Sequence, residues 1–212
     1  MLTRYFIFIS YKGTAYHGWQ IQPNSITVQK VLDEALCTVL NETIATIGAG
    51  RTDTGVHASF FCAHFDSLNK NLSENTNLIF RLNRYLPMDI SVNRIVKVSL
   101  DANARFSATY RTYKYYISRK KNPFTEGSAW YIHGDLDIDS MNKAASCLLR
   151  VKDFTSFAKL HSDTSTNFCK INCAEWIEKD DQLIFTITAD RFLRNMVRAI
   201  VGTLVEVGRH KI

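Results

Sequence analysis

The stretch YFIFISY, residues 5–11, is almost continuously apolar and aromatic, which predicts a strand buried within a sheet. The next patterned stretch, TVQKVLDEALCTVL (27–40), repeats apolar residues at helical spacing behind Thr27, a residue type suited to cap a helix N-terminus. A strand followed by an amphipathic helix opens a mixed α and β unit. The elements that follow decide which unit it is.

Those elements extend the first pair to a βαββαβ pattern. The sequence predicts a short β segment at 42–48, a strand at 60–66, a helix at 75–86 that ends before Pro87, and a strand of period two at 90–98. The pattern then repeats as a strand at 112–118 and a helix at 137–150. A hairpin of two strands, 172–179 and 182–189, follows with its turn at Asp180 and Asp181, and a last helix is predicted at 191–208. A short extra strand is expected at 130–132. The repeat therefore stops at βαββα, without its last strand.

The repeated pattern predicts an α+β fold. We expect two ferredoxin-like (βαββαβ) halves with a joined antiparallel sheet and helices on one side. The expected domains are 1–103, which carries a glycine-rich loop, and 104–212, from which the last strand is absent. A groove between the halves would be the natural site.

Composition narrows the class of protein without identifying it. The formal charge of +6 makes an anionic partner plausible, although a basic protein with no such partner fits equally well. The five cysteines form no C-x-x-C pair, so neither a disulfide framework nor a zinc site is expected. Apolar runs are too short for a signal peptide or a membrane span, which makes a reducing cytoplasm the expected location.

The loop GAGRTDTGVHA (48–58) places a single carboxylate, Asp53, among glycines. It lacks the Lys of a phosphate-binding loop, because Val56 follows the last glycine, and it does not match a dinucleotide fingerprint. Asp53-Thr54-Gly55 could be the D-T-G of an aspartic protease, but that fold is mostly β and carries apolar residues before the Asp. A tight turn with no chemical role stays open as an alternative.

Basic residues distinguish this loop from a plain turn. Arg51 lies two residues before Asp53, and Arg191, Arg194 and Arg198 recur at spacings of three and four, which would align them on one helix face. A carboxylate in a basic groove stays ionised well below neutral pH. Such a group suits a nucleophile better than a general acid.

Five motifs in order resemble the TruA family of tRNA pseudouridine synthases across almost the whole chain. The loop matches G-R-T-D-x-G-V-H, and it is accompanied by Y-x-G-x-x-Y-x-G-W-Q (11–20), ARFSATYRTYKY (104–115), DFTSF (153–157) and NMVRAIVGTLVEVG (195–208). The resemblance implies the pseudouridine synthase fold and an isomerase that detaches uracil from ribose at N1 and reattaches it through C5. It also implies action on positions 38, 39 and 40 of the tRNA anticodon stem-loop, homodimers, and no cofactor or metal.

The resemblance also assigns roles to individual residues. By motif position, Asp53 is the nucleophile, Tyr113 packs against the target base, and Arg198 pairs with the catalytic carboxylate. Arg51 is expected to insert into the RNA helix and hold the extruded uridine. Arg105 and Arg111 are candidates for phosphate contacts, while His57 is expected to cap the loop and His17, Gly18 and Trp19 to be structural.

The sequence departs from the family in a few places. Thr54 replaces an Ala or Lys, Tyr85 replaces an Asn, and relatives continue past the last helix into a further strand. These departures keep a second hypothesis open, a catalytically silent tRNA-binding protein. The presence of Asp53, Tyr113 and Arg198 argues against it.

Overall fold

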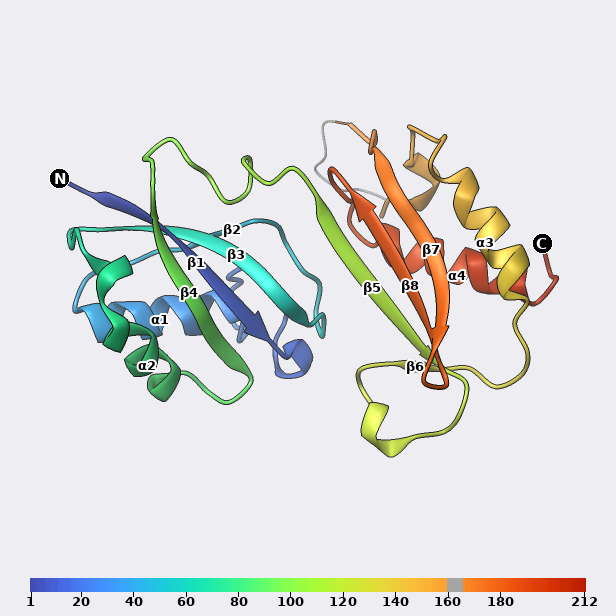
Figure 1. Cartoon of the computed structure of the whole chain (residues 1–212), viewed down its shortest axis with the longest axis horizontal. Helices are drawn as coiled ribbons and strands as arrows, with labels where there is room; N and C mark the ends of the chain where they lie inside the picture. Colours follow the sequence, from blue (N-terminus) through green and yellow to red (C-terminus); the bar gives the residue numbers. More distant parts are fainter. Residues whose placement is uncertain (160–165) are drawn as a thin grey trace. The chain divides into compact units, whose positions relative to one another are not determined.

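The computed structural model describes residues 1–159 and 166–212 and divides the chain into two compact units (Figure 1). Unit 1 is Met1–Ala108 and unit 2 is Thr109–Ile212. The division by contacts thus falls a few residues after the boundary expected at 103/104.

Unit 1 follows the order βαββαβ that the sequence predicts. Its elements are β1 (Thr3–Tyr11), α1 (Val28–Leu40), β2 (Ile47–Gly48), β3 (Ala58–Ser67), α2 (Thr76–Tyr85) and β4 (Ile90–Val98), with short 3₁₀ turns at Gly13–Ala15 and Leu72–Glu74. The strands form a sheet in the order β2-β3-β1-β4, in which β1 pairs antiparallel with both β3 and β4. This is the ferredoxin-like arrangement.

Local sequence explains where the first helix begins and ends. The Thr27 side chain accepts a hydrogen bond from the amide of Lys30 at 3.4 Å, as the sequence predicted for the N-cap. The helix ends at Asn41, whose left-handed backbone at φ 54° stops the helical hydrogen bonding. Strand β1 alternates buried and half-buried residues, because successive side chains point to opposite faces of the sheet.

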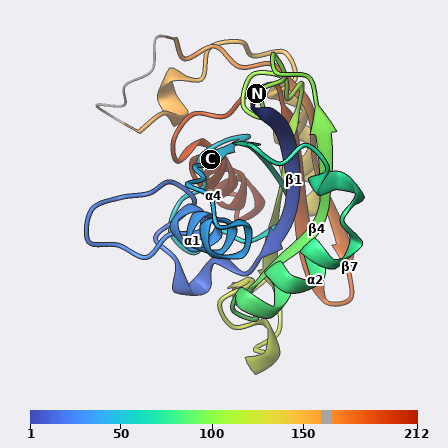
Figure 2. The ribbon, with the colours of Figure 1, turned by 90° about the vertical axis from the view of Figure 1, so that its left-hand side faces the viewer.

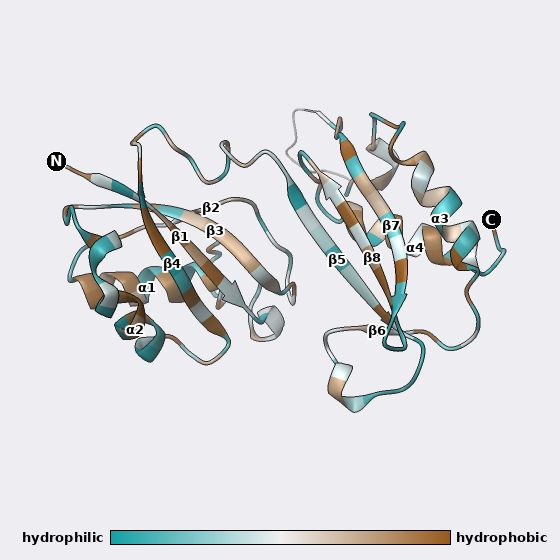
Figure 3. Cartoon of the chain, in the orientation of Figure 1, coloured by the Kyte–Doolittle hydropathy of each residue, from teal (hydrophilic) through white to brown (hydrophobic). Residues whose placement is uncertain are grey.

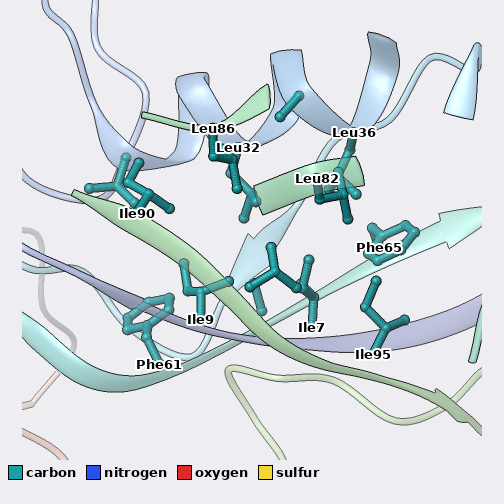
Figure 4. Packing of buried hydrophobic residues seen from close by; sticks show 14 of the residues in the cluster. Ile7, Ile9, Leu32, Leu36, Phe61, Phe65, Leu82, Leu86, Ile90 and Ile95 are labelled. Carbon is teal, nitrogen blue, oxygen red and sulfur yellow. The ribbon is translucent and has the colours of Figure 1, made fainter. Parts of the chain in front are cut away.

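The core of unit 1 lies between the sheet and its two helices. Ile7 and Ile9 of β1 point toward Leu32 of α1 and Leu82 of α2 in Figure 4, and all four are fully buried. Removing each such side chain from water stabilises the fold by roughly 1.5–3 kcal/mol. Figure 2 shows α1 on one side of β1 and β4, so the sheet has one face covered by helices.

Unit 2 repeats this plan with one substitution. Its elements are β5 (Arg111–Ser118), β6 (Trp130–Tyr131), α3 (Ile138–Cys147), β7 (Ile171–Lys179), β8 (Gln182–Ala189) and α4 (Met196–Gly208), with 3₁₀ turns at Pro123–Thr125 and Thr155–Phe157. The strand order is β6-β5-β8-β7, so β5, β8 and β7 correspond to β1, β3 and β2. In unit 1, the strand at this edge of the sheet is β4, which pairs with β1. In unit 2, the corresponding edge is formed by the short strand β6, which pairs parallel with β5. Figure 3 shows hydrophobic residues along β8 and a more polar β5.

The α+β class is confirmed, whereas the joining of the two sheets stays a prediction. Two predicted helix bounds were wrong. The helix expected at 191–208 begins at Met196, because Asn195 has a left-handed backbone at φ 67° and separates the preceding residues from the helix. The helix expected at 137–150 ends at Cys147 and continues as turns.

Candidate active site

Asp53 lies on the loop that connects two neighbouring strands of unit 1. β2 pairs antiparallel with β3 through Gly48 and Ala63, and the amide of Ala49 continues the pairing by donating to Cys62 O at 2.8 Å. The loop between these strands, residues 49–57, contains no other acidic residue. The Asp53 side chain is half-buried.

The loop is held by the segment that follows β1, residues 11–19, which we call the bracing segment. The amide of Trp19 donates to Thr52 O at 3.3 Å, and the Tyr11 hydroxyl lies 3.0 Å from Thr52 Oγ1. On the other side of Asp53, the amide of Gly55 donates to Tyr16 O at 3.3 Å. The backbone on both sides of the carboxylate is therefore bonded to the same segment.

Two glycines let the backbones of the bracing segment and the loop touch. A Cβ on Gly13 would lie 2.0 Å from Val56 O, and a Cβ on Gly18 would lie 2.2 Å from Thr52 O. Gly18 also has a positive φ of 86°, which side chains disfavour. Glycine is thus required at both positions.

The bracing segment is itself anchored to the end of the sheet. The Tyr16 hydroxyl donates to Asp89 Oδ1 at 2.6 Å, and the amide of Lys12 donates to Asp89 O at 2.8 Å. Burial, together with the hydrogen bond to Asp89, raises the pKa of Tyr16, so the phenol stays protonated and continues to donate. The loop is thereby connected to the residue just before β4.

Sequence reasoning missed this brace, since it treated Gly18 and Trp19 only as general loop and core structure. The signal was the pair of glycines between aromatic residues in Y-x-G-x-x-Y-x-G-W-Q. Which backbone these glycines approach depends on tertiary structure. His57 accepts a hydrogen bond at Nδ1 from the amide of Gly13 at 2.8 Å; its expected role as a cap of its own loop stays a prediction.

Arg51 and Arg105 line the same small cavity of unit 1. The cavity has a volume of about 70 Å³, and its other lining residues are Trp19, Gln20, Gln29, Thr46, Ile47, Gly48 and Gly50. Both arginine side chains are exposed. Two residues far apart in the sequence thus place positive charge beside the loop that carries Asp53.

The turn that carries Arg105 is fixed to β3. The amide of Ala104 donates to Nδ1 of buried His64 at 3.1 Å, and the amide of Arg105 donates to Asn103 Oδ1 at 3.0 Å. Burial, and then the positive charge of Arg4, lower the pKa of His64, which keeps the ring neutral and able to accept this bond.

The other candidate residues lie in unit 2. Tyr113 is on β5, and its ring meets the ring of Phe192 edge to face at 5.1 Å between centroids. Arg111, on the same strand, donates from Nη1 to Asp190 O at 2.8 Å. Arg198 is exposed in the first turn of α4. Tyr113 and Arg111 therefore both contact the segment that leads into α4.

The prediction that Arg191, Arg194 and Arg198 lie along one face of the last helix was wrong. Of these three residues only Arg198 is on α4, while Arg191 and Arg194 precede the helix. The left-handed backbone of Asn195 interrupts the helical spacing on which the prediction depended.

Residues 1–159 and 166–212 contain no group of three or more His, Cys, Asp or Glu side chains placed to hold a metal ion. No described helix is both long and apolar enough to cross a bilayer. A larger open hollow of about 440 Å³ beside α1 and Tyr85 contains none of the predicted site residues.

Comparison with known proteins identifies the family. The tRNA pseudouridine synthase family model matches residues 144–212. A tRNA pseudouridine synthase A of Bacteroides fragilis is 56% identical over 99% of this chain and 83% of its own length. The proteins of the same name from Porphyromonas gingivalis and Thermoanaerobacter sp. are 49% and 43% identical, over 100% and 97% of this chain and 84% of their own lengths. The chain therefore belongs to the tRNA pseudouridine synthase A family, and so to the isomerases that convert uridine to pseudouridine in tRNA.

Proposed function

We propose that this isomerase acts on uridines 38, 39 and 40 of the tRNA anticodon stem-loop, with Asp53 as its nucleophile. The observation that carries the proposal is the brace on both sides of Asp53. One carboxylate stands on a loop whose backbone is bonded at Thr52 and at Gly55 to the same segment. Nucleophilic catalysis needs such fixed geometry, because its rate depends on the approach of the reacting atoms.

The isomerisation needs no redox partner. The bond from ribose C1′ to uracil N1 breaks, a bond from C1′ to C5 forms, the C5 proton leaves and N1 gains a proton. A carboxylate that adds to the ribose or to the uracil ring is released unchanged at the end.

We propose roles in the reaction for three other residues. Tyr113 packs against the target base, Arg198 pairs with the carboxylate of Asp53, and Arg51 inserts into the RNA helix to hold the extruded uridine. Tyr113 is half-buried at the edge of the unit 2 core, as an aromatic that offers one face to a ligand would be. These roles rest on motif position.

Release of tritium from tRNA labelled at C5 of uracil tests the nucleophile. Transcripts that retain a single uridine at 38, 39 or 40 report each position separately. We expect release by the wild type and none by Asp53→Ala, with both proteins still binding tRNA. Release by Asp53→Ala would refute the nucleophile, and a lack of release from all three transcripts would refute the proposed positions.

The same assay distinguishes the proposed enzyme from a catalytically silent tRNA-binding protein. That alternative requires tRNA binding by the wild type without tritium release from any uridine. Membership in the enzyme family and the retained Asp53 disfavour it.

Arg105 and Arg111 are proposed to contact phosphates of the RNA backbone. For Arg105, the support is the cavity that it shares with Arg51, which is roomy enough for several water molecules and is flanked by two guanidinium groups. Removing one phosphate contact reduces the slope of log affinity against log salt by about 1.

We therefore expect a smaller slope for Arg105→Gln, measured by tRNA binding between low and moderate salt. Arg209→Gln is the matched control, because Arg209 is already paired with Glu206 at 3.1 Å. Equal slopes for the wild type and Arg105→Gln would remove Arg105 from the contacts.

A homodimer is proposed to form through the sheet face of unit 1 that its helices leave open. Phe6 and Phe8 of β1 alternate with the buried core residues, and the Phe8 ring stacks on Phe60 of β3 at 5.4 Å between centroids. Phe60 is 69% exposed. Neighbouring aromatic rings on an open sheet face are suited to a protein interface.

The mass of the particle in solution tests this interface. We expect a dimer for the wild type and a monomer for Phe60→Glu, whereas Phe124→Glu, at a side chain that is 97% exposed on the 3₁₀ turn Pro123–Thr125, should remain dimeric. A dimer that survives Phe60→Glu would place the interface elsewhere.

A further inference from the structure

The hydrogen bond of His57 has no part in the chemistry described above. His57 is the last residue of the Asp53 loop before β3, and Gly13 is the first residue of the 3₁₀ turn after β1. The 2.8 Å bond between Gly13 N and His57 Nδ1 therefore joins the exit of the loop to the bracing segment.

The chemistry of the two atoms fixes the state of the ring. A backbone N–H can only donate, so Nδ1 must present its lone pair, and the neutral ring carries its proton on Nε2. A proton on Nδ1 would put two N–H groups against each other. His57 can hold Gly13 only while Nδ1 takes no proton, which makes proton transfer at this atom incompatible with the bond.

The bond acts where the two backbones are closest. Gly13 approaches Val56 so tightly that a Cβ would lie 2.0 Å from the Val56 carbonyl oxygen and 2.7 Å from its carbon. The His57 bond to the same glycine adds an attraction at the point where the two backbones approach each other. The amide of Val56 also donates to Asp53 O at 3.2 Å, which links this contact directly to the nucleophile residue.

We propose that His57 is a positioning residue of the isomerisation. Its Nδ1 holds the exit of the loop against Gly13, and so keeps the Asp53 carboxylate in place for attack. The proposal rests on the proposed role of Asp53 as nucleophile. His57 itself transfers no proton and touches no reacting atom in this role.

Three substitutions of His57 distinguish a role in holding the loop from a role in proton transfer. Asparagine places Oδ1 as many bonds from Cα as histidine places Nδ1, so His57→Asn keeps an acceptor for Gly13 but has no titratable ring. Glutamine places its oxygen one bond farther away, and alanine has no acceptor. Misplacement of a catalytic group by about 1 Å costs on the order of 100-fold in rate. We expect kcat to fall about 10–100-fold in His57→Ala and His57→Gln and to be largely kept in His57→Asn.

The experiment measures the steady-state kinetics of tritium release, the affinity for tRNA and the hydrogen exchange of the Gly13 amide in the full chain. A positioning role predicts a loss in kcat with an unchanged KM for tRNA, and faster Gly13 exchange in the alanine and glutamine variants only. His17→Ala is the control, since His17 is an exposed histidine of the same bracing segment. It should leave the rate and the Gly13 exchange unchanged.

Two results would overturn the proposal. If His57→Asn is as slow as His57→Ala while its Gly13 amide stays protected, the ring acts chemically. If His57→Ala keeps the wild-type kcat, the bond has no catalytic effect. Failure of the nucleophile assignment shows separately, as tritium release by Asp53→Ala, and Gly13 exchange in His57→Ala then still reports whether the ring holds the loop.

Discussion

Gly18 shows how one residue without a side chain can fix the loop that carries Asp53. Its φ of 86° and the 2.2 Å that would separate a Cβ from Thr52 O both exclude other residues. The sequence alone singles out Asp53 as the candidate nucleophile, because its motif is local, and this role stays a proposal. The sequence was not sufficient to find the brace, because the approach of residue 18 to residue 52 depends on the folded structure.

We expect Gly18→Ala to destabilise unit 1 by about 1–3 kcal/mol, the usual cost of forcing a side chain into a positive φ. Urea unfolding of the full chain measures the effect. Gly50→Ala is the matched control, since a Cβ there would meet nothing within 4 Å, and it should change stability by less than about 0.5 kcal/mol. Equal stability of the two variants would contradict the close contact at Thr52.

Among the elements, those with strong periodicity were predicted best. The bounds of β4 were predicted as found, and α1 begins behind Thr27 as expected. β2 is shorter than predicted, since the strand covers Ile47–Gly48 and not 42–48. The start of α4 was missed, because the left-handed Asn195 leaves no mark on the apolar spacing around it.

The packing of α1 against the segment before β2 depends on a buried carboxyl group. Asp33 Oδ1 accepts from the amide and the hydroxyl of Thr46, at 3.0 and 2.6 Å. Burial outweighs these bonds and raises the pKa of Asp33 from 3.8 to about 6. Between these values the folded chain binds this proton more tightly than the unfolded chain does, so this contribution to stability is present at low pH and is lost as pH rises through about 6.

Asp33→Asn should remove that pH dependence, because its amide is always neutral and keeps an oxygen for Thr46. We expect the melting temperature of Asp33→Asn relative to the wild type to rise as the pH increases from about 4 to about 6, and then to level off. Asp139→Asn, at an exposed residue of α3, should show no such rise over this window. Parallel profiles for the wild type and Asp33→Asn would contradict the raised pKa.

On the scale of the whole molecule, each unit has a hydrophobic core of its own. The buried cluster of unit 1 runs from Tyr5 to Ile95 and that of unit 2 from Ile117 to Val205. The repeat in the sequence predicted this division, since each half carries its own strands and helices. The joining of the sheets lies beyond such reasoning, because periodicity describes only one element at a time.

We expect residues 1–108 to fold as an isolated fragment, because all the buried residues of the unit 1 core lie within it. A cooperative thermal transition and dispersed amide resonances would establish folding. Leu32→Ala, at a fully buried residue of α1, should lower the stability of the fragment by about 2–5 kcal/mol. A fragment that melts gradually, or one that is insensitive to Leu32→Ala, would show that the core does not form alone.

The bracing segment also determines which positions near the loop tolerate substitution. At Gly13 and Gly18 it meets the Asp53 loop backbone to backbone, so this contact requires that both positions lack a side chain. Exchanges of the exposed side chains of Lys12, just before Gly13, and of Thr14 and Ala15, between the two glycines, would alter the surface without moving the carboxylate. The backbone contact therefore tolerates exchanges at these exposed positions and is sensitive to any added side chain at Gly13 and Gly18, both occupied by the smallest residue.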